Sequence, residues 1–549
     1  MERSAGILLP LFSLPNESHV GTMGRDARAF VDFLAEAGCR WWQMLPINPI
    51  DRYYSPYSNA SAFAGEPLYL DLEELADEGL LDRDDLPKAV PSSFSDRSKA
   101  DYEAAGAERL PLYQKAFARY RAGEGGTRYR VREETFLSEN VFWLDDYTFF
   151  CVLADRFGTT VWPRWPKAFR DRDPEALARV RRESEETFAF HRFTQLVFDT
   201  QWCGLKEYCN TKGVRILGDV PIYVGMASAD TWTNRQFFRL DDDGWPRRIS
   251  GAPADAFSPD GQRWDSPLYN WSRLEETGFD WWLRRLDMTL RRFDAVRLDH
   301  FIGFYNYYSF PIYKRDRSIP VGPDEPTDGL VPTTPIDADG GFWTAGPREK
   351  FLDTVFAHFP KEAFIAEDLG VMTPGVHALR DHYQLPGMKV LVFAYEHRTG
   401  TDPDPMTEVC RNSVACTGTH DTQTVRGWLE ELRNPESPIP VNYSYVAEVF
   451  GRHLTQAEAT VAVPSRYTDP VRVTEQEMNL LVRCGVREVL ASRAETALVP
   501  IQDFLGLDDT ARVNSPGRIE NNWLWRLGRN DLSSDLAASI RNELEATNR

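Results

Sequence analysis

Eight short runs of apolar, β-branched and aromatic residues recur along the 549-residue chain, and turn-forming residues bound each of them. The runs are Ala5–Phe12, Arg40–Pro46, Val214–Val220, Asp294–Asp299, Ala363–Glu367, Met388–Tyr395, Ser413–Gly418 and Ala497–Asp503. Helical patterns follow several of them, as in Arg25–Ala37 and Thr424–Arg433. Apolar strands that alternate with helices are typical of a parallel sheet covered on both faces. Eight of them predict an α/β fold, the (β/α)₈ TIM barrel. A doubly wound open sheet is the alternative, although no glycine-rich phosphate turn follows the first run.

Large insertions must accompany such a barrel, because a plain one needs only about 250 residues. The stretch after residue 74 is rich in Arg, Asp and Glu at helical spacing, whereas residues 230–275 are dense in turn residues. We therefore expect five segments. They are 1–73 with barrel strands one and two, a mostly helical insertion over 74–210, strands three to seven over 211–434 with a loop or hairpin insertion at 230–275, a helical insertion over 435–495, and 496–549 with the last strand and the C-terminal region.

The charge balance narrows the class of partner. Lys and Arg number 63 and Asp and Glu number 83, a formal net charge of −20. This charge disfavours nucleic acid and an anionic membrane as partners and favours a neutral ligand.

The seven cysteines are scattered and form no C-x-x-C pair, so reduced thiols in the cytoplasm are expected. No run approaches the about 18 apolar residues of a membrane-spanning helix.

Acidic residues stand where four of the eight runs end. Asp219 is near the end of the third run, Asp299 ends the fourth, Glu367 ends the fifth, and Asp421 follows the seventh. In a (β/α)₈ barrel this end of the strands carries the active site, and burying carboxylates there is costly unless they are paired or used. Each could instead cap the helix that follows, but four of them on different strands favour a shared site.

Such a cluster suits glycoside chemistry. One carboxylate can attack the anomeric carbon while a second protonates the leaving oxygen, and in retaining enzymes the two lie about 5–5.5 Å apart. A third can hold sugar hydroxyls and stabilise the positive charge of the transition state. The chain also carries 16 Trp, 21 Tyr and 32 Phe. Most of these rings are expected in the core, and some can pack against the C–H faces of sugars.

Eight motifs in this chain resemble those of one enzyme family, in the family's order. They are RSAGILLPLFSLP (Arg3–Pro15), SPYSNASAFAGEPLYLDL (Ser55–Leu72), GDVPIYV (Gly218–Val224), GAPADAFSPDGQRW (Gly251–Trp264), VRLDHFIGF (Val296–Phe304), IAEDLGVMTPGVHALRDHYQLPGMKVLVFAY (Ile365–Tyr395), GTHD (Gly418–Asp421) and ARVNSPGRIENNWLWRL (Ala511–Leu527). The chain resembles the amylomaltases or disproportionating enzymes, the 4-α-glucanotransferases of glycoside hydrolase family 77. Any one motif alone is weak, but their co-occurrence is specific.

The resemblance implies a role for each catalytic-type carboxylate. Asp299 resembles the nucleophile and Glu367 the general acid/base. Asp421 resembles the residue that stabilises the transition state by gripping hydroxyls of the donor-site glucose. Arg297 precedes Asp299 by two residues and so lies on the same strand face, where its charge is expected to keep the nucleophile ionised.

Other positions resemble the family's substrate-binding residues. Tyr57 is expected to stack on the bound glucose, and His300 and His420 to bind sugar hydroxyls, although a structural histidine is the alternative for each. A turn-rich loop, 250–266, is expected to cover the site. Weaker candidates for substrate binding are Asp219, Asp255, Gln262, Trp264 and Asn514.

The chain departs from the family pattern in a few loops. Thr422, Gln423 and Thr424 stand where Asn-Asp-Thr is usual, so the first two depart; the others are Asp265 and Ser266 where Gly-Asn is usual, and Ala254 and Ala256 where Pro and an aromatic residue or Leu are common. We expect them to affect acceptor contacts and chain-length preference more than bond cleavage.

No metal or cofactor is expected. Asp-His pairs occur at 299–300 and 420–421, but adjacent strand residues point to opposite faces, and no H-E-x-x-H motif is present. The DDDG sequence at 241–244 lacks the alternating ligands and the distant Glu of a calcium loop. A hairpin turn is expected there.

The resemblance implies a 4-α-glucanotransferase that moves segments of α-1,4-glucan to glucose or maltodextrin acceptors by a retaining double displacement. The expected partners are maltodextrins and α-glucans derived from starch or glycogen. An α-glucan hydrolase of the α-amylase-like group is the near alternative. A glucan-binding protein that has lost catalysis is another, although all three catalytic-type carboxylates are present.

Overall fold

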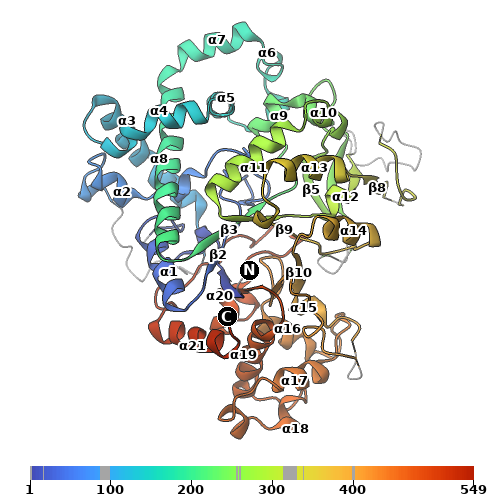
Figure 1. Ribbon diagram of the computed structural model, residues 1–549. Helices are drawn as coiled ribbons and strands as arrows, with labels where there is room; N and C mark the ends of the chain where they lie inside the picture. Colours follow the sequence, from blue (N-terminus) through green and yellow to red (C-terminus); the bar gives the residue numbers. More distant parts are fainter. Residues whose placement is uncertain are drawn as a thin grey trace.

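The fold is a closed barrel of eight parallel strands (Figure 1). The computed structural model describes residues 3–16, 18–86, 99–254, 258, 261–312, 330–337, 339–398 and 402–549. In order around the barrel the strands are β1 (Ser4–Leu8), β2 (Trp41–Gln43), β3 (Arg215–Val220), β6 (Ala295–Leu298), β9 (Phe364–Ala366), β10 (Gly387–Val390), β11 (Ser413–Cys416) and β12 (Thr496–Pro500). Pairing of β12 with β1 closes the barrel. Each predicted apolar run supplies one strand, so the predicted fold is confirmed.

All eight predicted runs are longer than the strands they form, and three of them continue into a helix or a 3-10 turn. The first run leaves β1 at Leu8 and continues into a 3-10 turn, Leu11–Ser13. The sixth and eighth runs pass directly from strand to helix, into α15 (Leu391–Ala394) and α20 (Ile501–Leu505). Continuous burial hides these transitions, because a fully apolar stretch carries no period that separates strand from helix.

Helices alternate with the barrel strands along the chain, as their patterns predict. They include α1 (Arg25–Glu36), α8 (Glu185–Thr211), α11 (Asp280–Arg292), α13 (Arg348–His358), α14 (Pro374–His382), α16 (Val425–Leu432), α19 (Glu475–Ala491) and α21 (Ser534–Ala546). The first of them forms because Phe30, Val31 and Leu34 share one buried stripe. Thr424 caps α16 by accepting a hydrogen bond from the Gly427 N–H. None of the helices within the described ranges has the length and apolarity to span a membrane.

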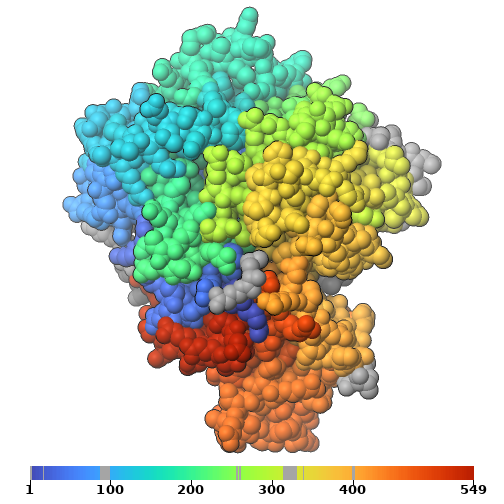
Figure 2. All heavy atoms as spheres, viewed as in Figure 1, coloured from blue at the N-terminus to red at the C-terminus, as the bar shows by residue number. Residues whose placement is uncertain are grey.

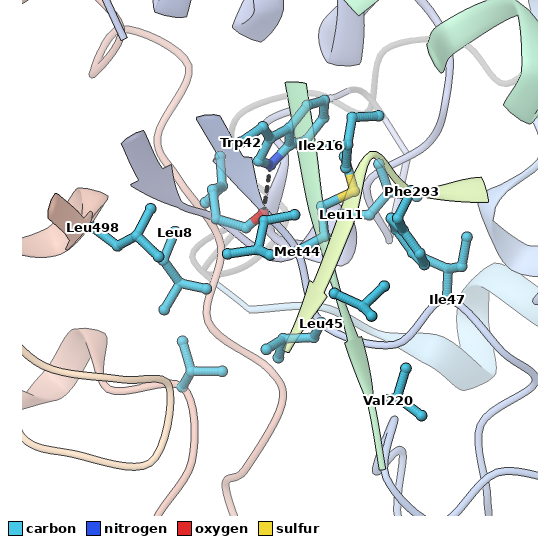
Figure 3. Packing of buried hydrophobic residues seen from close by; sticks show 14 of the residues in the cluster. Leu8, Leu11, Trp42, Met44, Leu45, Ile47, Ile216, Val220, Phe293 and Leu498 are labelled. Atoms are coloured by element: carbon cyan, nitrogen blue, oxygen red, sulfur yellow. Dashed lines mark hydrogen bonds between the residues drawn. The ribbon is translucent and has the colours of Figure 1, made fainter. Parts of the chain in front are cut away.

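The barrel core joins residues from both ends of the sequence. Leu8 of β1, Trp42 of β2, Ile216 of β3 and Leu498 of β12 are buried in one cluster (Figure 3). The Nε1–H of Trp42 donates to the Leu9 carbonyl oxygen at 2.8 Å, so the polar atom of this buried ring is satisfied. This packing fixes the strand ends and therefore positions the loops that follow them.

Further helices lie outside the barrel. Between β2 and α8 they are α2 (Leu72–Asp77), α3 (Tyr102–Ala122), α4 (Thr127–Glu139), α5 (Leu144–Phe157), α6 (Lys167–Arg170) and α7 (Pro174–Glu183). At the opposite end of the molecule, α17 (Tyr443–Gly451) and α18 (Pro464–Tyr467) lie in an orange lobe (Figures 1 and 2). Helical patterns were expected in both regions, and the division of the chain into five segments stays a prediction.

A four-stranded antiparallel sheet accompanies the barrel, in the order β5–β4–β7–β8. Its strands are β4 (Arg248–Ala252), β5 (Gln262–Pro267), β7 (Asn306–Pro311) and β8 (Phe342–Ala345). The expected covering loop at 250–266 therefore begins and ends in paired strands. These strands approach closely at Gly251, where a Cβ atom would lie 2.2 Å from the Gln262 carbonyl oxygen, so only glycine fits.

Candidate active site

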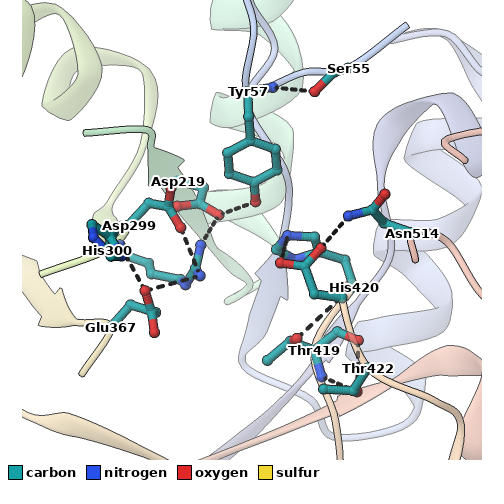
Figure 4. Close-up of polar contacts among 12 residues, drawn as sticks. Ser55, Tyr57, Asp219, Asp299, His300, Glu367, Thr419, His420, Thr422 and Asn514 are labelled. Atoms are coloured by element: carbon teal, nitrogen blue, oxygen red, sulfur yellow. Dashed lines mark hydrogen bonds and ion pairs between the residues drawn. The ribbon is translucent and has the colours of Figure 1, made fainter. Parts of the chain in front are cut away.

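The acidic residues at the strand ends converge at one mouth of the barrel (Figure 4). Asp219 lies in β3 and Arg297 in β6, while Asp299 and Glu367 are the next residues after β6 and β9. Asp421 lies in the loop between β11 and α16. The strands are parallel, so their carboxyl ends share one end of the barrel. The structure thus brings together the four carboxylates that the sequence singled out.

Arg297 links three of these carboxylates. Its Nη1 lies 2.6 Å from Asp219 Oδ2, and its Nη2 lies 2.9 Å from Asp299 Oδ1 and 3.9 Å from Glu367 Oε2. Burial opposes the guanidinium charge, but the charges of Asp219 and Asp299 outweigh it and raise the pKa of Arg297. This planar cation therefore stays charged and fixes the carboxylates relative to one another.

Two opposing effects, burial and the charge of Arg297, determine the pKa of Asp299. Burial raises the pKa of Asp299 to about 6, against the lowering effect of Arg297. The Arg297 charge acts in the direction that the sequence predicts, favouring the ionised form, but burial is the larger of the two effects. Asp299 is still mainly ionised at pH 7, as a nucleophile requires.

Glu367 is buried more deeply, and its pKa is raised further. Its two carboxyl oxygens accept hydrogen bonds from the backbone N–H groups of His300 at 2.7 Å and Leu369 at 2.9 Å. Burial raises the pKa of Glu367 well above its usual range, and the charge of Asp299 adds to this, against the effect of Arg297. Burial thus disfavours the charged form of Glu367 more strongly than that of Asp299, which is the order of pKa values that an acid beside a nucleophile needs.

The spacing of this pair is bounded by their shared contact. Since Asp299 and Glu367 approach the same Nη2 atom, at 2.9 Å and 3.9 Å, their contacting oxygens are no farther apart than these two distances together. That limit includes the spacing of about 5–5.5 Å found in retaining glycosidases.

Asp421 faces this pair from the loop after β11. His420 Nε2 lies 3.2 Å from its Oδ2, and the Asn514 amide donates to its Oδ1 at 2.5 Å. Burial opposes ionisation, but His420 and Asn514 outweigh it and lower the pKa of Asp421 to about 2. Asp421 is therefore an ionised acceptor at every pH at which the fold is normally studied.

Tyr57 lies above the ion-pair cluster (Figure 4). Its Oη–H donates to Asp219 Oδ2 at 2.7 Å. Its ring stacks on His420, with centroids 5.1 Å apart and planes 15° apart, and the Trp523 ring lies 5.8 Å away. Asp219 is thus a partner of both Arg297 and Tyr57. The aromatic side of the site is formed by Tyr57, His420 and Trp523, which come from three separate loops.

His300 adopts a left-handed backbone conformation, with a φ of 50°, which non-glycine residues seldom adopt. The edge of its ring meets Trp264 at a centroid distance of 4.8 Å. Burial lowers the pKa of His300 to about 4, so the ring is neutral at pH 7. Its Nε2 is buried and has no hydrogen-bond partner within the described part of the chain, which leaves it free for a sugar hydroxyl.

Comparison with known proteins places the chain in a family. Residues 9–531 match the family model described as 4-alpha-glucanotransferase. The chain belongs to the 4-alpha-glucanotransferase family. It is 36% identical to the 4-alpha-glucanotransferase of Thermus thermophilus, over all of this chain and 99% of that protein. It is also 36% identical to the Aquifex aeolicus enzyme, over 96% of this chain and 95% of that one. The solved amylomaltase of Streptococcus agalactiae, in complex with acarbose, superposes with a TM-score of 0.84 at 31% identity, and each chain is covered completely. The protein is therefore a glucanotransferase, as the motifs implied.

In this glucanotransferase, the structure describes two of the three predicted binding residues of the loop 250–266. Gln262 and Trp264 lie on β5, where the Trp264 Nε1–H donates to Gln262 Oε1 at 3.0 Å. Asp255 lies outside the described residues. Trp264 also approaches Tyr223, at a centroid distance of 6.2 Å, so β5 reaches the mouth of the barrel through Trp264.

The glucanotransferase departs from its family mainly at residues that shape loops. Thr422 Oγ1 accepts a hydrogen bond from the Thr419 N–H at 2.9 Å, and Gln423 donates to Asp509 at 2.9 Å. Asp265 and Ser266 lie within β5 and not in a loop as expected, and Asp265 has a left-handed φ of 55°. The contacts of Thr422 and Gln423 hold the loop after β11, and the expected effect of the departures on acceptor contacts and chain-length preference stays a prediction.

Sequence reasoning missed two residues beside Asp421. Arg512 donates to its backbone carbonyl oxygen at 2.7 Å, and Trp523 packs near His420 at 6.0 Å. Both belong to the motif Ala511–Leu527, in which only Asn514 was singled out. The described residues contain no cluster of three or more His, Cys, Asp or Glu side chains suited to a metal ion.

Proposed function

We propose that this glucanotransferase moves segments of α-1,4-glucan from a donor chain to glucose or maltodextrin by a retaining double displacement. The observation that carries the proposal is the Arg297 guanidinium, which lies 2.9 Å from Asp299 and 3.9 Å from Glu367 and so holds the two carboxyl groups together. The expected donors are maltodextrins and α-glucans from starch or glycogen. The cytoplasmic location expected from the sequence stays a prediction.

In the first step an Asp299 carboxylate oxygen attacks the anomeric carbon of the donor glucose. The bond from that carbon to the leaving oxygen breaks, and the Glu367 proton passes to the oxygen. The products are a glycosyl ester on Asp299 and a shortened glucan with a new 4-hydroxyl. Burial raises the pKa of Glu367, which favours the protonated form that this step needs.

In the second step the roles of the two carboxyl groups reverse. An acceptor hydroxyl attacks the anomeric carbon from the face that the leaving group vacated, and Glu367, now ionised, takes its proton. The ester bond to Asp299 breaks and restores the carboxylate. Two inversions at one carbon retain the α configuration.

Asp421 is proposed to bind hydroxyls of the donor-site glucose as positive charge develops on the ring. Its pKa of about 2 keeps it ionised throughout, and fixed charges act most strongly where charge appears in the transition state. The neutral His300, with its free Nε2, and His420, which contacts Asp421, are proposed as further hydroxyl partners.

Product analysis with maltotriose tests the proposal. Transfer predicts glucose and a ladder of longer maltodextrins, with little net gain of reducing ends. New reducing ends with no product longer than maltotriose would identify a hydrolase. Unchanged maltotriose in the presence of measurable binding would identify a glucan-binding protein without catalysis.

A further inference from the structure

The loop that carries Asp421 is attached at both ends to one buried carboxylate, that of Asp503. Thr417 follows β11 directly, and Val425 is the first residue of α16. The Thr417 hydroxyl donates to Asp503 Oδ2 at 2.5 Å, and the Val425 N–H donates to Asp503 Oδ1 at 2.8 Å. Asp503 is 1% exposed, so both hydrogen bonds are shielded from water.

The chain after Asp503 holds the next part of the same loop. Asp509 accepts hydrogen bonds from the Thr424 N–H at 3.0 Å and from the Gln423 side chain at 2.9 Å. Gly427 makes room for it, because a Cβ atom there would lie 2.1 Å from Asp509 Oδ1. The close approach of these two segments is therefore built into the sequence.

The end of this segment reaches Asp421 itself. The Arg512 guanidinium donates a hydrogen bond to the Asp421 backbone carbonyl oxygen at 2.7 Å. The Asn514 side-chain amide donates to the Asp421 carboxylate at 2.5 Å. The Asn514 N–H also donates to the His420 carbonyl oxygen at 3.0 Å. We call residues 503–514 the clamp, since they contact the loop at its two ends and at its functional residue.

We propose that Asp503 is a positioning residue that sets the orientation of Asp421 in the transition state. This inference rests on the role proposed for Asp421. A carboxylate is suited to the position because its two oxygens accept from Thr417 and Val425 at once. A carboxamide has one acceptor oxygen, so Asp503→Asn must lose or reverse one of the two hydrogen bonds while it keeps the size of the side chain.

A double-mutant cycle with Asp421→Asn tests this inference. We expect Asp503→Asn to lower the kcat for transfer from α-maltosyl fluoride to maltose by up to about a hundredfold, the loss associated with a misplacement of about 1 Å. In the Asp421→Asn background the same substitution should have little further effect, because the group that it positions is already gone. A loss of correctly folded enzyme would instead lower kcat equally in both backgrounds.

Asp230 provides a matched control. It is buried to a similar degree, at 3% exposed, and burial raises the pKa of both Asp230 and Asp503 to about 6. It accepts the Ala62 N–H at 2.8 Å, in a different loop. Asp230→Asn should therefore act additively with Asp421→Asn.

A second variant keeps the test decisive if Asp503→Asn does not fold. Thr417→Val removes only the hydroxyl that binds Asp503 and should show the same non-additivity with Asp421→Asn. Additive behaviour of Asp503→Asn, or of Thr417→Val in its place, would overturn the inference. If Asp421→Asn itself keeps wild-type kcat, it is the proposed function that fails, and the positioning role fails with it.

Discussion

Arg297 and Asp219 form an ion pair inside the barrel, with Nη1 2.6 Å from Oδ2 and no more than 5% of either side chain exposed. Removing one member of a buried pair leaves an uncompensated charge, which is costlier than the pair is stabilising. In the proposed mechanism the pair also supports the reaction, since the second nitrogen of the same guanidinium contacts Asp299. Stability and chemistry therefore depend on one cation.

Substitution of Arg297 should separate these two effects. Arg297→Met should lower the free energy of unfolding by about 3–5 kcal/mol, because Asp219 and Asp299 lose their counter-charge. Arg297→Lys should recover part of that stability but little activity, because a single ammonium cannot reproduce the planar fork. Urea titrations and initial transfer rates measure the two losses. An active Arg297→Lys enzyme would show that charge alone suffices.

Asp299→Asn should abolish turnover and stabilise the fold at neutral pH. The pKa of Asp299 in the folded protein, about 6, lies above the ordinary aspartate pKa of 3.8. The folded protein therefore binds this proton more tightly, and the stability that the residue contributes is lost as pH rises from about 4 through 6. Asparagine mimics the neutral form, so the gain at pH 7.5 is up to about 3 kcal/mol.

Thermal unfolding between pH 4 and pH 8 measures this gain, which should shrink toward pH 4. Asp219→Asn is the control, since Asp219 is the closer partner of Arg297, at 2.6 Å, and is fully buried, so its loss should destabilise the protein. If Asp299→Asn keeps more than a few per cent of activity with native-like melting, the nucleophile is a different residue.

Glu367→Gln should respond to the leaving group of the donor. Fluoride departs without a proton, so α-maltosyl fluoride should restore much of the first step, whereas maltotriose should not.

For the wild-type enzyme, kcat/KM should fall below about pH 6, where Asp299 becomes protonated, and again at high pH as Glu367 ionises. The alkaline fall should be absent for Glu367→Gln with the fluoride. Equal damage with both donors would reject the acid role.

Trp264→Ala should raise hydrolysis relative to transfer. Trp264 packs its ring against His300 beside the reacting carboxyl groups, and a smaller residue there admits water to the glycosyl enzyme. Trp343→Ala is the matched control, since Trp343 belongs to β8 of the same sheet but packs on Tyr308 at 5.3 Å. The measurement is the ratio of new reducing ends to glucose released from maltotriose. An equal ratio in both variants would remove Trp264 from the control of water.

The barrel and its acidic mouth were accessible from the sequence because both follow from local patterns. Asp299 and Glu367 directly follow short apolar strands, and parallel strands bring such positions together without further information. The balance at Asp299 was not accessible, since burial against the Arg297 charge depends on the packed surroundings. The contact of Asp503 with Thr417 was equally hidden, because 86 residues separate the two in sequence and no periodicity relates them.

The pairing of β12 with β1 determines when the barrel can close during synthesis of the chain. β1 leaves the ribosome early, but its neighbour at Thr496–Pro500 and the clamp at 503–514 arrive only after almost all other residues described. Until then the nascent chain presents two open strand edges, those of β1 and β11, and Asp421 lacks the contacts of Arg512 and Asn514. Closure of the sheet and completion of the catalytic mouth thus occur together, so a ribosome-bound fragment that ends before residue 496 is expected to be inactive and dependent on chaperones.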